Sequence, residues 1–414
     1  HRAGRDPTSL RTDARGGDRG QPRDVDVVAP PLEAHPTGQV TGNEDMKRTA
    51  VVILNWNGRE HLEQFLPSVV EHTPRAVRIV VADNGSTDSS VRFIEEHYPT
   101  IEIIRLDRNY GFAEGYNRAL KEVDAEYFIL LNSDVEVTAG WVEPLVATLT
   151  NDLSVAAVAP KLRSYGRRDE FEYAGAAGGF IDYLGYPFCR GRILSTIEQD
   201  EGQYDTPREG FWASGAAFCC KADVFRALGG FDADFFAHME EIDLCWRMQL
   251  QGYKVMVEPR SVVYHLGGGT LPNESPRKLY LNYRNNLAML FKCAPTMQRV
   301  VAAVIRPLAD LLSVVLYLLK RQPDLAMATL KAYRDFFAWH SAECLFCFRN
   351  NQIRIYSMVI VVLLATVASN SYFFTITANN NEYKFQILNK YNKEEKIIKK
   401  IYYYEEKDYK CIYP

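Results

Sequence analysis

Between residues 50 and 265 short apolar runs alternate with segments of helical periodicity, and this alternation constrains the fold more than any other feature of the chain. Runs rich in Val, Ile and Leu are typical of strands that are buried on both faces. They occupy Val51–Leu54, Val77–Ala82, Ile101–Leu106 and Tyr127–Leu131. Helical patterns lie between them, over His61–Glu71, Ser89–His97 and Ala113–Val123. Strands that alternate with helices predict an α/β fold with a mostly parallel central sheet and flanking helices.

Each apolar run ends in a cluster of amide, carboxylate and glycine residues. The clusters are Asn55-Trp56-Asn57-Gly58, Asp83-Asn84-Gly85-Ser86-Thr87-Asp88, the stretch from Asn109 to Asn117, and Asn132-Ser133-Asp134. Taken singly, the first two would each be explained as a turn. The carboxyl ends of parallel strands meet at one edge of a sheet, where ligands of α/β proteins bind. Four such clusters in succession therefore predict a nucleotide cleft.

Asp134 follows its strand directly, and we expect it at the mouth of this cleft. A carboxylate in that position can hold a divalent cation. The cation can in turn hold a diphosphate, because hard oxygen ligands and substrate phosphates are the usual surroundings of Mg²⁺.

The second half of the domain has longer loops, with helices predicted over Gly140–Thr150, Ala222–Leu228 and Glu240–Gln251. Glu240, Glu241 and Asp243 open the last of these. Acidic residues in a first turn also suit the helix dipole, so a solvated helix start is the alternative interpretation. His265 ends a Val-rich strand before a Gly-rich loop, where it is either a ligand or a structural histidine.

The ends of the chain differ in composition from its middle. Residues 1–45 are rich in Arg, Asp, Gly and Pro, so we expect them to be disordered and Met46 to be the natural start. Residues 276–338 have helical patterns. The stretch 300–319 is mostly apolar but contains Arg306 and Asp310, which favours an amphipathic helix on a membrane or on the domain over a span. The apolar run 356–369 is short for a span, and we expect the Lys/Asn/Tyr/Glu-rich tail 379–414 to be disordered.

Bulk properties exclude some classes of function. The net charge of −4 does not suit a nucleic-acid-binding protein. The eight cysteines have no framework spacing, which predicts reduced thiols in a cytosolic protein. Cys344 and Cys347 stand three residues apart without a second pair or nearby histidines, so they do not indicate a metal or redox site.

The four clusters, in this order and spacing, resemble family 2 glycosyltransferases, and most of all the bacterial rhamnosyltransferase-like branch. The resemblance covers residues 48–293. It implies a GT-A fold, a nucleotide-diphosphate sugar donor, a divalent metal (Mg²⁺ or Mn²⁺) and inversion at the anomeric carbon. The implied domain division is a leader over 1–45, a GT-A domain over 46–293, an amphipathic helical extension over 294–340 and a divergent tail over 341–414.

The resemblance also implies roles for single residues. Asp134 would be the metal-binding carboxylate of an Asp-x-Asp element in which Asn132 replaces the first Asp, and His265 would complete the metal site. Arg284 would meet the diphosphate bidentately, with a helix-surface arginine as the alternative. Donor contacts would come from Asn55, Asn57, Asp83, Asn109, Phe112, Gly115, Asn117, Asn132 and Arg284.

The second half resembles the acceptor side of the same family. Gly210–Ala216 resembles the acceptor-facing segment, with Trp212, Ser214 and Gly215 as its contacts. The stretch from Phe235 to Arg247 resembles the acidic element whose second acid is the general base, here Glu241 in place of the usual Asp. Glu240 and Asp243 remain rivals. An inverting displacement needs one such base, and clustered acids raise each other's proton affinity.

We therefore expect an inverting hexosyltransferase at the inner face of the membrane, in the cytoplasm. It would act on a hydroxyl of a glycan or lipid-linked glycan precursor of the cell surface. Two rivals are a sugar-phosphate nucleotidyltransferase, which should have a better phosphate loop than Asn57-Gly58-Arg59, and a non-catalytic nucleotide-sugar-binding subunit. A dinucleotide oxidoreductase is disfavoured because no Gly-x-Gly-x-x-Gly follows the first strand.

Overall fold

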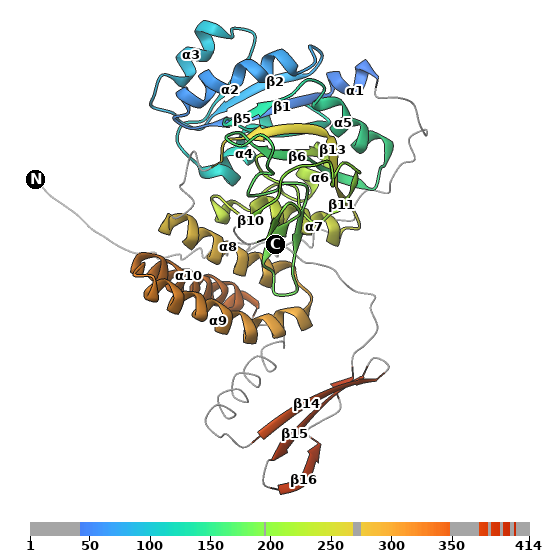
Figure 1. The fold of residues 1–414 in the computed structure, drawn as a ribbon, viewed down its shortest axis with the longest axis vertical. Helices are drawn as coiled ribbons and strands as arrows, with labels where there is room; N and C mark the ends of the chain where they lie inside the picture. The colour runs from blue at the N-terminus through green and yellow to red at the C-terminus, as the bar shows by residue number, and fades with distance from the viewer. Residues whose placement is uncertain are drawn as a thin grey trace, which may run out of the picture. The chain divides into compact units, whose positions relative to one another are not determined.

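A computed structural model describes residues 42–193, 196–267, 275–347, 372–379, 382–389, 392–397 and 401–402, with side chains as far as residue 338. The chain forms two compact units, of which one is Ala34–Cys347 and the other includes Phe348–Pro414. Figure 1 labels the helices and strands, and the unit that begins at Ala34 contains all residues discussed below unless stated.

A nine-stranded sheet forms the centre of this unit, in the order β11-β13-β6-β12-β4-β1-β2-β3, with β5 paired to β13. Its strands are β1 (Thr49–Asn55), β2 (Arg78–Asp83), β3 (Glu102–Arg105), β4 (Tyr127–Asn132), β5 (Val135–Val137), β6 (Val155–Ser164), β11 (Arg208–Gly210), β12 (Ala217–Lys221) and β13 (Lys254–His265). The four predicted strands are β1 to β4, and their ends differ from the prediction by one or two residues. They pair in parallel, as predicted.

The second half of the sheet departs from the mostly parallel arrangement that the sequence predicts. β12 runs antiparallel to both β4 and β6, and β11 and β5 run antiparallel to β13. The reason lies between β6 and β12, where the described residues form short antiparallel pairs in place of a crossover helix. The chain therefore enters β12 at the same end of the sheet at which it leaves β6. The small hairpin strands are β7 (Gly179–Ile181), β8 (Pro187–Cys189), β9 (Arg192–Ile193) and β10 (Thr196–Ile197). The α/β class is confirmed, with a mixed sheet.

Helices cover both faces of this sheet (Figure 1). They are α1 (Asn43–Lys47), α2 (Arg59–His72), α3 (Ser90–His97), α4 (Gly111–Glu122), α5 (Val142–Asn151), α6 (Ala222–Ala227) and α7 (Glu240–Leu250), with a 3₁₀ turn η1 (Ala233–Phe235). Each predicted helix of this region is present. Alternate residues of β1 face opposite sides, as the period of a strand requires: Val51 and Ile53 pack with α2 and α5, and Ala50 and Val52 pack with α4. The apolar runs are continuous because the sheet has a core on each face.

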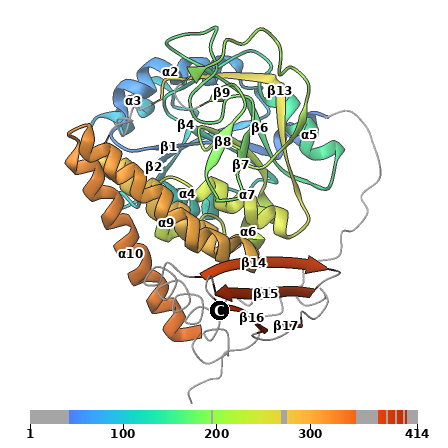
Figure 2. The same cartoon turned by 60° about the horizontal axis from the view of Figure 1, so that its bottom comes forward.

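Three longer helices follow the sheet: α8 (Pro276–Cys293), α9 (Thr296–Leu319) and α10 (Pro323–Cys347). They confirm the helical pattern predicted over 276–338. α10 contacts both α8 and α9. In Figure 2, α9 and α10 meet near one end and diverge from there. Cys189, Cys219, Cys220, Cys245 and Cys293 are buried free thiols, as predicted.

The second unit contains an antiparallel sheet of β14 (Tyr372–Asn379), β15 (Glu382–Asn389), β16 (Asn392–Ile397) and β17 (Ile401–Tyr402). These strands lie largely inside the tail for which the sequence predicts disorder. The apolar run 356–369 and residues 1–41 lie outside the described residues, so the predicted leader, the possible span and the domain boundaries stay predictions.

Candidate active site

The strand-end clusters meet at one edge of the sheet. In the parallel register Asn55 stands beside Asp83, and Leu54 stands beside Asn132. The Asn55 side-chain amide donates to the Asp83 carboxylate over 3.2 Å. Among the described residues the buried Asn55 Oδ1 has no hydrogen-bond partner. The edge thus presents an amide oxygen and a carboxylate together, a pair that suits the edge of a nucleoside base.

Asn57 holds two of these clusters together. It adopts a left-handed backbone, with φ of 50°, which asparagine tolerates better than most residues. Its side-chain oxygen accepts the backbone N–H of Thr87 at 2.7 Å and that of Asp88 at 3.3 Å. The Asn57 side-chain oxygen therefore orders the loop after β2.

The third cluster forms the start of α4, and it leans against the loop that precedes α7. The Asn109 side chain accepts from Asn84 and from the backbone N–H of Gly111. The Phe112 N–H donates to the Phe236 carbonyl at 2.6 Å. A Cβ on Gly115 would come within 2.9 Å of the Asn84 amide nitrogen, so this position has no room for a side chain.

Asn117 makes different contacts from the donor contact that the resemblance implies. Its amide donates to the Phe231 carbonyl at 2.7 Å and accepts the Phe231 N–H at 2.9 Å. Both ends of the side chain are used to fasten the loop before η1. The structure therefore gives Asn117 a role in the scaffold of the site.

Asp134 and His265 come together at the end of the sheet. The antiparallel pair β5–β13 sets Val135 beside His265, and His265 Nε2 lies 3.3 Å from Asp134 Oδ1. On the other side of the ring, His265 Nδ1 lies 3.4 Å from Glu172 Oε1. Glu172 is buried and comes from the long loop after β6.

The two carboxylates determine the charge of this histidine. Burial disfavours a charged imidazole, but the adjacent carboxylates of Asp134 and Glu172 outweigh it and raise the pKa of His265 to about 10. Burial likewise opposes ionisation of Asp134, yet the hydrogen bond with His265 keeps the pKa of that carboxyl below its ordinary value. The protonated imidazole therefore supplies the positive charge between two carboxylates.

Asp134 and His265 can supply some of the ligands of a metal ion but not a complete set. Among the residues described with side chains, no group of three or more His, Cys, Asp or Glu is arranged to hold a metal ion. Asp134 offers an oxygen and His265 a nitrogen 3.3 Å apart, and buried Nδ1 of His265 lacks a well-formed hydrogen bond. Two protein ligands fit a cation whose other ligands are diphosphate oxygens and waters.

The acidic residues at the start of α7 have contrasting surroundings. Glu240 and Glu241 each have a buried carboxylate oxygen without a hydrogen-bond partner in the described part of the chain. Burial raises the pKa of Glu241 to about 7. Burial and then repulsion from Glu241 raise that of Glu240 well above its ordinary value. Asp243, fully buried, lies 2.8 Å from Arg247 Nε and 2.8 Å from Lys292 Nζ. Its charge is balanced, so of the three predicted acids Asp243 is the one committed to structure.

A strained loop sets the direction of the two glutamates. Phe236, His238 and Met239 all have positive φ, between 63° and 74°, which costs free energy for residues with a side chain. The buried Asn285 amide of α8 offsets this cost, because it donates to the carbonyls of Phe235, Ala237 and His238 at 2.7 to 2.9 Å.

Arg284, beside Asn285, donates to the carbonyls of Asp234 and Phe235. It also lines a cavity of about 220 Å³ with Asp335 and Phe336. These contacts tie the guanidinium to the loop before α7, and within the described part of the chain no hydrogen bond joins it to Asp134 or His265.

The predicted acceptor segment connects the two acidic regions. The Asn132 N–H donates to the Ala216 carbonyl at 3.0 Å, which joins the segment to the fourth cluster. Next to it, the Gly215 N–H donates to Glu241. A Cβ on Gly215 would touch Phe112 at 3.5 Å and Glu241 at 3.8 Å. Gly215 therefore lies between the Phe112 ring and the Glu241 carboxylate.

Two other residues of this segment are buried in the scaffold. The Trp212 indole donates to the Phe180 carbonyl at 2.8 Å and packs on Gly179. The Ser214 hydroxyl donates to the Ala174 carbonyl at 3.0 Å. Both side chains therefore hold the acceptor segment against the domain and do not project from it.

Sequence reasoning missed Glu172, Asn285 and Asn84. Glu172 lies in a loop region without periodicity, and Asn285 lies inside a helical pattern where a polar residue reads as surface. Asn84 belongs to the second predicted cluster, but the sequence gives it no role of its own; its amide donates to the Gly111 carbonyl at 2.9 Å and accepts the Tyr110 N–H. No local pattern distinguishes these residues, since each acts on a partner distant in sequence.

Comparison with known proteins agrees with this geometry. Residues 50–208 match the model of glycosyl transferase family 2. The N-acetylglucosaminyl-diphospho-decaprenol L-rhamnosyltransferase of Mycobacterium tuberculosis is 28% identical over 233 residues, which cover 52% of this chain and 75% of that protein. The pre-mycofactocin glycosyltransferase of the same organism is 28% identical over 221 residues, covering 52% of this chain and 42% of that protein.

Solved structures give more distant likenesses. GalNAc-T7 with UDP, GalNAc and Mn²⁺ has a TM-score of 0.46 at 20% identity, covering 60% of this chain and 48% of the other. The mannosyltransferase PcManGT of Pyrobaculum calidifontis, in complex with GDP-Man and Mn²⁺, has a TM-score of 0.42 at 17% identity, covering 78% and 86%. Because both TM-scores are below 0.5, neither likeness determines the fold or the function of this chain.

Proposed function

This chain belongs to glycosyltransferase family 2, with the α/β GT-A fold, and we propose that it is an inverting enzyme that transfers a hexose to a lipid-linked glycan precursor. A nucleotide-sugar glycosyltransferase is what the family match establishes. The stereochemistry, the metal, the site residues and the acceptor are proposals. The observation that carries them is Glu241, a buried carboxylate beside Gly215 that has one oxygen, Oε2, without a hydrogen-bond partner among the described residues and a pKa raised to about 7.

The nucleoside end of the donor is proposed to lie over Asn55 and Asp83, beside the start of α4. The buried, partner-free Oδ1 of Asn55 supports this, because an unsatisfied amide oxygen costs free energy unless a ligand donates to it. Asn109, Phe112 and Gly115 would form the wall of that pocket, and Asn132 would lie at its junction with the metal site.

The diphosphate is proposed to lie at Asp134 and His265. A divalent cation, Mg²⁺ or Mn²⁺, would be held by the Asp134 carboxylate and the His265 imidazole, and it would neutralise the charge of the leaving diphosphate. His265 would have to release its proton for this purpose. Glu172 would keep the ring oriented, as carboxylate partners do for metal-bound histidines.

Glu241 is proposed as the general base of a single displacement. The acceptor hydroxyl oxygen attacks the anomeric carbon as its proton passes to the Glu241 carboxylate. The bond from the anomeric carbon to the diphosphate oxygen breaks, and the nucleoside diphosphate leaves with that electron pair. Attack from the face opposite the leaving group inverts the anomeric carbon. A pKa near the working pH is the favourable value for such a base.

The acceptor and the location rest on likeness. A relative is named as a rhamnosyltransferase acting on a sugar linked through diphosphate to decaprenol. We propose that this chain likewise uses a sugar on a polyprenyl diphosphate, at the cytoplasmic face of a membrane.

The test is release of nucleoside diphosphate from a panel of UDP-, dTDP- and GDP-sugars, with Mg²⁺ or Mn²⁺ and with EDTA, in the presence and absence of a lipid-linked glycan acceptor. Metal-dependent release from one donor that the acceptor stimulates would support the proposal. Tight donor binding without release would indicate a non-catalytic binding subunit. Formation of a nucleotide sugar from a nucleoside triphosphate and a sugar phosphate would indicate a nucleotidyltransferase.

A further inference from the structure

The polarity of α9 is the reverse of that of a helix packed on a water-soluble domain. Its buried side includes Arg306 and Asp310, which are exposed by only 1% and 2%. Its outer side consists of large hydrophobic residues, and Leu308 and Leu312 are exposed by 67% and 59%. From 303 to 319 every exposed residue is apolar. The exposed large residues recur at helical spacing and so form one face: Ile305, Leu308, Leu311, Leu312, Val315, Leu316, Leu318 and Leu319.

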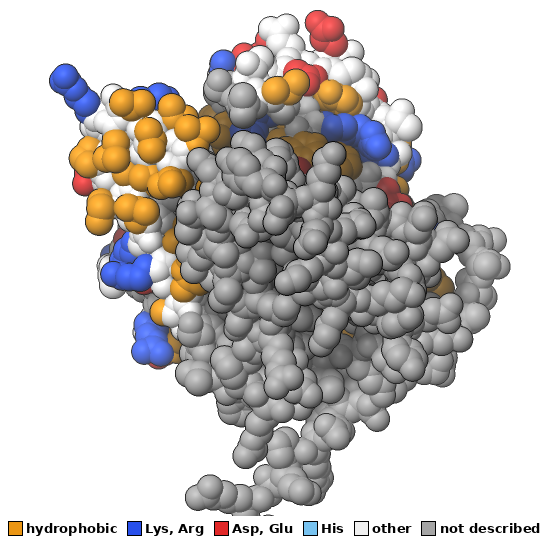
Figure 3. All heavy atoms as spheres, turned by 90° about the horizontal axis from the view of Figure 1, so that it is seen from below, with side chains coloured by type: hydrophobic (Ala, Val, Ile, Leu, Met, Phe, Trp, Pro, Cys, Tyr) orange, Lys and Arg blue, Asp and Glu red, His pale blue; other side chains and the backbone are white. Residues whose placement is uncertain are grey.

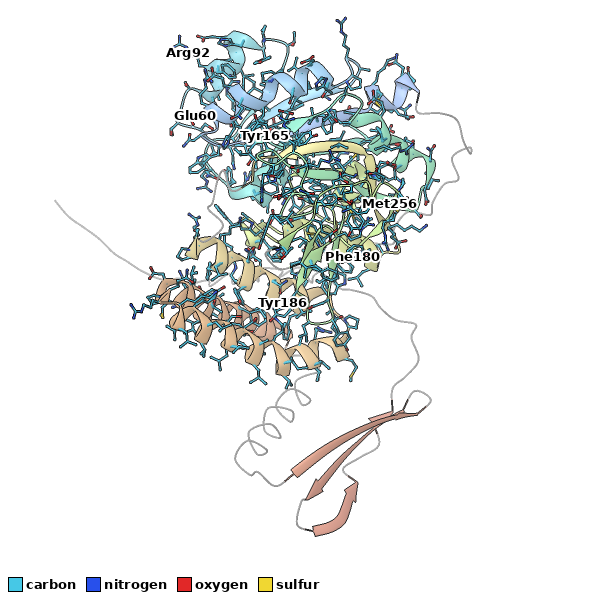
Figure 4. All side chains as sticks on the ribbon, viewed as in Figure 1. Glu60, Arg92, Tyr165, Phe180, Tyr186 and Met256 are labelled. Atoms are coloured by element: carbon cyan, nitrogen blue, oxygen red, sulfur yellow. The ribbon has the colours of Figure 1, made fainter. Side chains whose placement is uncertain are left out.

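Hydrogen bonds fix this orientation of the helix. Arg306 donates to the Leu184 carbonyl at 2.8 Å and to Asn286 Oδ1 at 2.6 Å. Asp310 accepts from the hydroxyls of Tyr186 and Tyr333, each at 2.5 Å. Tyr186 is labelled in Figure 4, on the side of the sheet domain nearest the C-terminal helices. Rotating α9 to hide its leucines would separate both charges from these partners outside the helix, which is costly for buried ions.

The apolar face of α9 continues onto α10. Met327, Leu330 and Phe337 of α10 are also exposed. We call these residues and the exposed set of α9 together the apolar face. Seen from below, the molecule shows hydrophobic side chains gathered on the part of its surface where α9 and α10 lie (Figure 3). Single exposed leucines are common on soluble proteins, whereas a contiguous face of this kind marks an interaction surface.

We propose that the apolar face docks the enzyme on an anionic lipid bilayer. A lipid surface suits a face whose α9 part, from 303 to 319, exposes only apolar residues. The basic charge at its edge fits the same partner. Lys320 and Arg321 follow the last leucine of α9, and both are exposed. Basic residues at the edge of an apolar face attract anionic headgroups.

In this arrangement α9 lies in the plane of the membrane surface. The helix is long and apolar enough to cross a membrane by length and composition. A crossing, however, would pull Arg306 and Asp310 away from Leu184, Asn286 and Tyr186. The helix therefore inserts its outer side among the lipids and keeps its inner side on the domain.

The same contacts connect the lipid surface to the acceptor half of the enzyme. The turn between β7 and β8 is held by α9: Gln298 donates to the Tyr183 carbonyl at 2.9 Å, and Arg306 donates to that of Leu184. Docking would thus bring this turn next to the headgroups, where a polyprenyl-linked sugar would be presented. This use of the surface rests on the proposed function, whereas the surface itself does not.

The experiment is flotation of the full chain with vesicles of phosphatidylcholine, with and without phosphatidylglycerol. Leu308→Glu/Leu312→Glu should weaken binding about a hundredfold, since burial of each leucine is worth about tenfold or more in an equilibrium constant. Val70→Glu/Leu153→Glu is the matched control, because both residues are single exposed hydrophobics outside the apolar face. It should bind like the unaltered chain. Lys320→Glu/Arg321→Glu should weaken binding to the anionic vesicles, by about fivefold for each residue, and leave binding to the neutral ones nearly unchanged.

Equal binding by the apolar-face variant and the control would overturn the proposal. So would an unaltered chain that does not float but is a dimer by light scattering, with the variant a monomer, because the occupant would then be a second copy. Donor-dependent release of nucleoside diphosphate, measured on the same samples in solution, separates a failure of docking from a failure of the proposed function.

Discussion

The site contains two buried acidic regions that differ in their partners. Asp134 lies against the imidazole of His265, and the pKa of its carboxyl is lowered. Glu240 and Glu241 have no cationic partner among the residues described, and burial raises the pKa of both. The same chemical group is thus prepared for two tasks. A carboxylate kept ionised suits a cation, and one that binds a proton near neutrality suits proton transfer.

α7 repeats this contrast within one helical turn. Asp243 is as deeply buried as Glu240, yet it is compensated by Arg247 and Lys292. Within one acidic motif, Asp243 therefore serves stability, whereas Glu241 is the position that we propose for catalysis. The following changes break or sharpen these contrasts, from the largest expected effect to the smallest.

Glu241→Gln should lower the turnover of sugar transfer by about 10²- to 10⁴-fold, the usual contribution of a general base. The amide has the same shape but accepts no proton, so the affinity for nucleoside diphosphate should stay the same. Steady-state kinetics and calorimetric titration measure the two quantities. Glu240→Gln is the control, with a smaller loss of turnover. Equal losses in the two variants would make the pair, and not Glu241, the base.

Asp243→Asn should lower the free energy of unfolding by about 3–5 kcal/mol, because it leaves the largely buried Arg247 without its carboxylate and Lys292 with Asp232 alone. Urea unfolding followed by circular dichroism measures it. Glu240→Gln should be neutral or stabilising in the same assay, since it removes a buried carboxylate that has no cationic partner. If both variants lost stability alike, the contrast within α7 would be wrong.

Glu172→Gln should weaken binding of Mn²⁺ in the presence of nucleoside diphosphate by about 10- to 100-fold, as expected for loss of the residue that orients a ligand histidine. Removal of the ligand Asp134 by Asp134→Asn should weaken it more. Electron paramagnetic resonance of bound Mn²⁺ reports both without turnover. Unchanged Mn²⁺ affinity in both variants would refute the metal site.

The pH dependence of turnover should reveal the raised pKa of Glu241. The ionised carboxylate is the active form, so turnover should rise about tenfold per pH unit below about 7 and level off above it. The free energy of unfolding should decrease as pH rises over the same range. The native state holds a proton that the unfolded chain releases above the ordinary pKa of 4.5, so this contribution to the unfolding free energy is lost as pH rises to about 7. In the Glu241→Gln variant, turnover and the free energy of unfolding should both depend less on pH. A turnover that is flat from pH 5.5 to 8 would contradict the role of Glu241.

The sequence predicts the first half of the molecule well because there the determinants are local. The four apolar runs, of which Val51–Leu54 is the first, indicate buried strands by their composition alone. The clusters that follow these runs lie at one edge of the sheet because the strands are parallel. The antiparallel insertion of β12 was not predicted, because it depends on where residues 165–216 fold back. The sequence also could not separate Asp243 from Glu240, since the difference lies in Lys292, nearly fifty residues away. Asn117 shows the same limit, because its partner Phe231 belongs to another loop.

The most direct test measures binding and turnover together in Glu241→Gln and Asp134→Asn. Each variant would be titrated with nucleoside diphosphate and Mn²⁺ and then assayed with donor and acceptor. The division of roles predicts that Glu241→Gln binds the metal–diphosphate pair like the unaltered enzyme but fails to transfer, whereas Asp134→Asn loses the metal-dependent part of binding. Transfer by Glu241→Gln at the unaltered rate would contradict it.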